Sequence, residues 1–168
     1  MSNVLEAELL VHLDAQIASA RRLLGFVLEQ GKSIRARDVD AVIARLTDIQ
    51  TEMGRRSSLE QDRAGLLQRA ATALRTSVAA VTLEHLCALV SPAAAQAARD
   101  RSAELRGLLA EIAREHGINR ALMRQELAFL AHLTRLIGHE PEAGYAQPGT
   151  GTAQPTAPAI HRVLDLQA

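Results

Sequence analysis

The stretch from residue 99 to residue 137 limits the possible folds most, because it has no proline and its apolar residues recur in alternating steps of four and three. This spacing is typical of a helix that packs against another helix along one stripe. We call that stripe the seam; its apolar positions are Leu105, Leu109, Ile112, Met123, Leu130, Leu133 and Ile137. In its middle the seam carries His116, Asn119 and Glu126. The sequence therefore predicts one long helix with a polar layer near its centre.

Composition favours an all-α protein without a nucleic-acid partner. The chain has 168 residues, with no Trp, one Tyr and two Phe, so it lacks the aromatic side chains that usually fill a compact mixed core. Val and Ile are few beside Leu, Ala, Glu, Gln and Arg, which favours helices over sheets. Nineteen basic and nineteen acidic residues are interspersed, and no basic block indicates nucleic acid.

The sequence also indicates a cytoplasmic protein rather than a secreted or membrane-inserted one. Cys87 is the single cysteine, which excludes an internal disulfide and fits a reducing compartment. No basic region precedes the first apolar residues, so a secretory signal is not expected. No apolar run approaches the ~18 residues of a spanning helix, so membrane insertion is not expected either.

Helical periodicity and cap signals predict four helices, over residues 3–30, 39–77, 82–90 and 92–138. Gly31 is expected to end the first helix and Asp38 to cap the second. Ser91 reads as the N-cap of the last helix, and Pro92 suits its first position because proline lacks an N–H. That last helix would be roughly 70 Å long at ~1.5 Å per residue, so the molecule should be elongated.

The expected fold is an elongated antiparallel helical hairpin or coiled coil, with a third N-terminal helix packed on one end and a short helix at the hairpin tip. If the second and last helices pair about residue 87, Arg56 lies opposite Asn119. We expect a polar layer of Arg56, Glu60, His116 and Asn119 that fixes this register at a cost in stability.

The last thirty residues form a separate region by composition. Residues 1–138 are expected to form the helical domain and residues 139–168 a flexible tail, because Pro, Gly, Thr and Ala dominate up to residue 158. The end of the tail differs, because its apolar residues can line one side of a short helix: Ile160, Val163, Leu164 and Leu166. Such an element is a candidate recognition segment or latch.

Residue patterns for catalysis or for metal and cofactor binding are weak. No Glu is followed three residues later by His, no two histidines are four apart, and Cys87 has no Cys-x-x-Cys partner. His132 is the best candidate for a phosphotransfer histidine on a helix bundle. Arg135 can imitate the lysine of the His-x-x-Lys-Gly pattern, but Leu136 replaces the glycine, so a surface histidine is the better interpretation. We expect no catalysis and no cofactor.

Apolar side chains span about half the circumference of the last helix near its end, at ~100° per residue. The arc consists of Ile118, Leu122, Met123, Leu127, Phe129, Leu130, Leu133, Leu136 and Ile137. It can form a partner groove, or it can be covered by two neighbouring helices. The second interpretation is favoured for the centre of the arc. It leaves the flanks at Ile118, Phe129 and Leu136 for a partner.

Several segments occur in a recognisable order. They are GKSIRARDVDAVIARLTDIQ at 31–50, LEQDRAGLL at 59–67, Asn119-x-x-Leu122-Met123, Tyr145, Gly149, and the ending Leu164-Asp165-x-x-Ala168. In this order the chain resembles the FlgN-like flagellar export chaperones over nearly its whole length. The family often shows a second asparagine one turn before the first, and here His116 stands in that place.

The resemblance implies a cytoplasmic, non-catalytic helical chaperone of flagellar type III secretion. It would hold hook-associated (hook–filament junction) proteins by a C-terminal amphipathic helix and deliver them to the export apparatus, with the export ATPase complex or export gate as receiving partners. The expected partner-binding residues are Ile118, Leu122, Phe129, Leu133, Leu136, Tyr145, Val163, Leu164 and Leu166. Two alternatives stay open: a structural coiled coil whose seam dimerises and, more remotely, phosphotransfer at His132.

Overall fold

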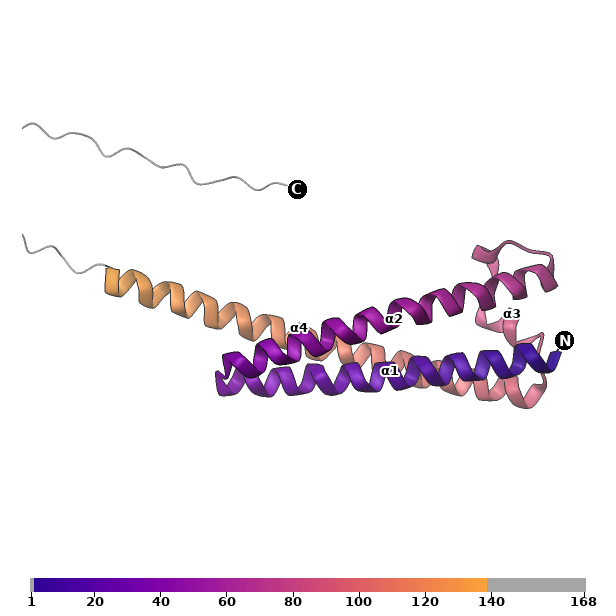
Figure 1. The fold of residues 1–168 in the computed structure, drawn as a ribbon, viewed down its shortest axis with the longest axis horizontal. Coiled ribbons are helices and arrows are strands. Elements are labelled where there is room, and N and C mark those ends of the chain that lie inside the picture. Colours follow the sequence, from indigo (N-terminus) through magenta and orange to yellow (C-terminus); the bar gives the residue numbers. More distant parts are fainter. Residues whose placement is uncertain (1, 139–168) are drawn as a thin grey trace, which may run out of the picture.

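The computed structural model describes residues 2–138, which form three long helices and a short connection (Figure 1). In chain order the elements are α1 (Ser2–Ala36), α2 (Val39–Leu74), the 3-10 helix η1 (Val78–Ala80), α3 (Leu83–Cys87) and α4 (Pro92–Gly138). No strand occurs among these residues, so the predicted all-α helical bundle is confirmed. The predicted tail lies outside the described residues.

Helix α1 is the centre of the molecule, because both α2 and α4 pack on it. Figure 1 shows α2 running back along α1, while α4 runs in the same direction as α1. Direct contact between α2 and α4 is slight within the described residues. The predicted register between the second and last helices is therefore wrong: Asn119 lies against α1 and not against Arg56.

The buried surface of α1 explains this central position. Its buried apolar residues follow each other at helical spacing along nearly the whole helix: Leu9, Leu13, Ile17, Ala20, Leu23, Val27 and Ile34. Beside this stripe Gln16, Ser19 and Gln30 are buried as well, so the covered face is wide enough for two neighbouring helices.

Helix boundaries follow local capping, and the largest difference from the expectation is at the end of α1. Helix α1 does not stop at Gly31 but continues to Ala36, and the chain turns at Arg37, whose φ is 57°. Asp38 then caps α2 as predicted, because its carboxylate accepts a hydrogen bond from the Ala41 N–H at 3.0 Å. At the start of α4 the Ser91 hydroxyl accepts from the Ala94 N–H.

The main apolar core lies at the end of the molecule that carries α3. It is built from α1, α2, α3 and α4 by Leu9, Leu13, Leu66, Ala70, Leu86, Cys87, Ala95 and Ala98. This end was expected to be the tip of a two-helix hairpin, with the third long helix packed on the other end, whereas four elements meet there. At the opposite end α4 runs past the turn between α1 and α2, and no other described helix lies beside its last turns (Figure 1). The thick and thin ends are thus reversed.

Candidate partner-binding site

The seam of α4 is longer than the helix that covers it. At ~100° per residue, Asn119, Leu130 and Ile137 point within about 20° of one direction along the helix. Asn119 is buried against α1, but Leu130 is 55% and Ile137 is 75% exposed. Leu130 and Ile137 are exposed because α1 ends at Ala36 and does not extend far enough to cover them. We call α4 residues 127–138 the free arm.

A groove opens where the free arm leaves the α1–α2 turn. Its volume is about 440 Å³. It is lined by Ile34, Arg37, Val39, Val42, Met123, Glu126, Leu127, Phe129 and Leu130. We call it the apolar groove, since Arg37 and Glu126 are its only charged lining residues.

The apolar surface continues from the groove along the first half of α2. Val39, Ile43, Leu46 and Met53 are all exposed on this helix. Together with Leu127, Phe129, Leu130, Leu136 and Ile137 of the free arm, they account for most of the exposed large apolar side chains of the described residues. Contiguous exposed apolar surface of this kind marks an interaction site in soluble proteins.

Asn119 holds α4 on α1 just before the free arm begins. Its side chain is buried, and Nδ2 donates to the Val27 carbonyl at 2.7 Å and to Gln30 Oε1 at 3.4 Å. Gly31 makes room for it, because a Cβ there would lie 2.5 Å from Asn119 Oδ1. The glycine within α1 is therefore explained by close helix packing rather than by a helix end.

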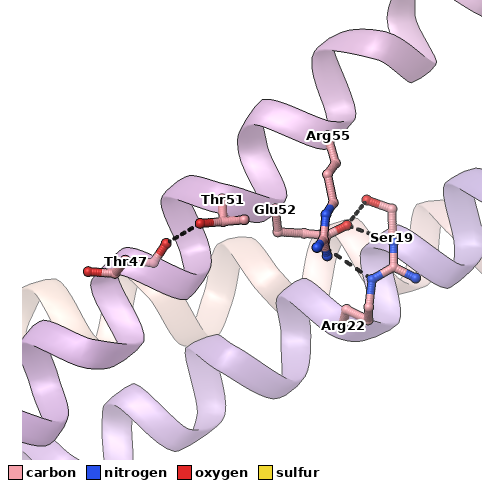
Figure 2. A network of polar contacts seen from close by, with 6 residues as sticks. All are labelled: Ser19, Arg22, Thr47, Thr51, Glu52 and Arg55. Atoms are coloured by element: carbon pink, nitrogen blue, oxygen red, sulfur yellow. Dashed lines mark hydrogen bonds and ion pairs between the residues drawn. The ribbon is translucent and has the colours of Figure 1, made fainter.

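Glu52 is the corresponding polar anchor between α2 and α1 (Figure 2). This fully buried carboxylate accepts from Ser19 Oγ at 2.7 Å, from Arg22 Nη2 at 2.9 Å and from Arg55 Nη1 at 3.3 Å. The hydrogen bond from Arg22, against the opposing effect of burial, lowers the pKa of Glu52 to about 2. Next to it the Thr51 hydroxyl donates to the Thr47 carbonyl within α2.

The four residues of the predicted polar layer do not form one layer. Asn119 is buried, whereas His116 and Glu60 are exposed. Glu60 accepts hydrogen bonds from Gln16 on α1 and from Arg63 on α2. Arg56 is half-buried, and its Nη1 is hidden from solvent without a hydrogen-bond partner in the described structure. Within the described residues, α2 and α4 are instead each joined to α1 by separate polar contacts, such as those of Glu52 and Asn119.

The structure places five of the predicted partner-binding residues on α4. Ile118, Phe129 and Leu136 are exposed, and Leu122 and Leu133 are half-buried. The other four lie outside the described residues: Tyr145, Val163, Leu164 and Leu166.

The interpretation that two helices cover the centre of the arc is wrong, because no helix of the described structure lies over the free arm. Ile137 and Leu130, near that centre, are 75% and 55% exposed. Sequence reasoning also missed the groove wall at Ile34, Val39 and Val42, since it ended the first helix at residue 30 and paired the last helix with the second.

The two side chains considered for chemistry, His132 and Cys87, are not among the residues that line the groove. His132 is exposed on the free arm. Cys87 is buried in the core, where its Sγ donates to the Ala95 carbonyl at 3.6 Å and burial raises the pKa of its thiol. Within residues 2–138 no three His, Cys, Asp or Glu side chains are grouped to hold a metal ion. In the same range no helix is long and apolar enough to cross a bilayer.

Comparison with known proteins agrees with this architecture. The family model described as "FlgN protein" matches residues 1–152, which is most of the chain. No curated protein and no solved structure matches significantly. The match includes α1, α2 and the whole of α4 with its free arm. The chain therefore belongs to the FlgN family of flagellar export chaperones.

Proposed function

We propose that the protein is a non-catalytic cytoplasmic chaperone that binds the C-terminal helical segment of hook-associated proteins before their export. One observation supports this most: the seam of α4 continues beyond the end of α1 with its apolar residues uncovered. A surface of this kind suits helix-in-groove recognition, in which a partner helix presents apolar residues at i, i+3, i+4 and i+7.

In this proposal the chaperone acts by binding alone, through the length and exposure of the free arm. The free arm has twelve residues and so offers roughly 18 Å of helix at ~1.5 Å per residue. A client helix of about three turns that lies along it replaces the missing continuation of α1. Its own apolar face is then covered, which keeps the client from assembling early. Delivery follows when the export ATPase complex or the export gate receives the chaperone with its client.

Calorimetry with a C-terminal fragment of a hook-associated protein tests the proposal. We expect binding to the full chain and a loss of at least tenfold in affinity for Leu127→Asp, because a charge then faces the client's apolar side chains. The matched control is Val11→Asp, since Val11 on α1 is 68% exposed and Leu127 is 65% exposed. Absence of binding by the unchanged protein would refute the proposal.

The uncovered seam also suits the structural alternative, a second copy of the chain. Light scattering across concentration separates the two. A stable dimer that the client fragment cannot dissociate would favour the structural coiled coil, while a monomer that binds the fragment supports the chaperone.

A further inference from the structure

We propose that the apolar groove accepts an amphipathic helix with acidic side chains along the edge that lies against α4. This inference rests on the proposed function and specifies the chemistry of the client segment. The apolar lining accounts for binding a helix face, and the charges at the rim determine which helix and which orientation fit.

The α4 side of the groove has a basic rim. Arg120 and Arg124 are four residues apart, so their side chains leave the same side of α4. Leu127, a lining residue of the groove, follows Arg124 by three residues and lies one turn further on. Both arginines are exposed, and neither forms an ion pair in the described part of the chain. Two unpaired positive charges thus border the apolar surface.

The opposite side of the groove carries negative charge. Helix α2 begins there with the N-cap Asp38 and with Asp40 in its first turn. Arg37, which lies between the two sides, is already paired with Glu126 at 3.4 Å. A bound helix with acidic side chains on its α4-facing edge can form ion pairs with Arg120 and Arg124. A helix in the reverse orientation would bring its acids toward Asp40.

Charge also distinguishes this occupant from the two others that the chain itself offers. A second copy would bring the same arginines to the same rim, and like charges would oppose each other. The apolar segment at residues 160–166 contains Arg162 together with Asp165, so it has no net acidic edge. An acidic helix from another protein is the occupant that complements the rim.

Three synthetic helical peptides test this inference. They share one apolar face and carry Glu, Gln or Lys at the same positions along one edge, and their affinity for the full chain is measured by fluorescence anisotropy. We expect the Glu peptide to bind about threefold to tenfold more tightly than the Gln peptide, and the Lys peptide more weakly still, as expected for two exposed charge pairs. These differences should shrink in 0.5 M salt, at which the Debye length is roughly 4 Å.

Substitution of the two rim arginines tests whether they cause the preference for the Glu peptide. The double variant Arg120→Gln/Arg124→Gln should bind all three peptides with nearly equal affinity. The matched control is Arg106→Gln/Arg114→Gln, which removes the same charge from the same helix. Arg106 lies roughly 21 Å before Arg120 along the helix, and Arg114 leaves a face turned away from the seam. This control should keep the preference for the Glu peptide.

Several results would overturn the inference. Equal affinity for the three peptides, no binding of any, or a preference that survives in the Arg120/Arg124 variant would each do so. Equal strengthening of all three peptides by Val163→Glu/Leu164→Glu would identify the chain's own segment as the occupant. A dimer that the peptides dissociate would identify a second copy.

The inference and the proposed function can fail separately. If hook-associated fragments bind without any dependence on Arg120 and Arg124, the chaperone function stands and the charge rule is wrong. If acidic peptides bind in the expected order while those fragments do not, the groove chemistry stands and the client is another protein.

Discussion

The two ends of the molecule use similar residues for opposite purposes. At the α3 end, leucines and alanines of four elements bury one another, and Ala70 and Ala98 have no exposed surface. At the other end, the seam of α4 continues at the same spacing with no helix of residues 2–138 over it. The difference lies in the neighbours rather than in the composition. A seam stabilises the fold where a second helix reaches it, and where none does we propose that it serves as a binding surface.

Truncation of a core leucine should give the largest effect on stability. Leu9 is 2% exposed in the core, so Leu9→Ala should lower the free energy of unfolding by about 2–5 kcal/mol. Urea denaturation followed by circular dichroism measures it. If this variant is as stable as the unchanged protein, the α3 end is not the core of the fold.

The Glu52 anchor should make stability depend on acid. Because its folded pKa of about 2 lies below the ordinary 4.5, it stabilises the fold above pH ~4.5, and this contribution is lost as the pH falls toward 2. We expect Glu52→Gln to cost about 1–3 kcal/mol at pH 7 and to flatten this part of the pH profile. Denaturation of both proteins between pH 2 and 7 tests it; parallel profiles would contradict the buried ion pair.

Loss of the Asn119 amide should have a smaller effect on stability and a further effect on the free arm. Asn119→Ala removes the bonds to Val27 and Gln30 and leaves Gln30 Oε1 buried without this donor, at a cost of about 1–2 kcal/mol. Amide hydrogen exchange should show faster exchange around residues 119–126. Unchanged exchange there would mean that Asn119 does not hold α4 on α1.

Truncation in the free arm should have almost no effect on stability. Leu127→Ala should change the free energy of unfolding by less than about 0.5 kcal/mol, because its side chain is already in water. The same urea experiment provides the comparison with Leu9→Ala. Destabilisation as large as that of Leu9→Ala would show that the free arm is packed in solution.

Much of the fold follows from periodicity, but the pairing of helices does not. The seam of α4, the Asp38 cap and the importance of Asn119 are visible in the sequence. Every long helix here has a heptad-like stripe, however, and stripes of equal period fit several registers and partners. On α2, for example, the apolar Met53 is exposed, while its charged neighbour Glu52 is buried against α1.

The candidate site was only half predictable for the same reason. Ile118, Phe129 and Leu136 are apolar residues on one helix and could be found from spacing alone. The opposite wall, formed by Ile34, Val39 and Val42, depends on where α1 ends relative to α4. That relation depends on Gly31, whose role is evident only when Asn119 is seen beside it.

Amide hydrogen exchange with and without a hook-associated C-terminal fragment tests the central claim most directly. In the free protein, amides near Ala98 should be protected, and those of the free arm should exchange quickly because no other helix of the described chain covers them. On binding, protection should rise along residues 123–138 and at the start of α2, with little change at the α3 end. Binding that leaves the free arm unprotected would contradict the claim that the uncovered seam is the client site.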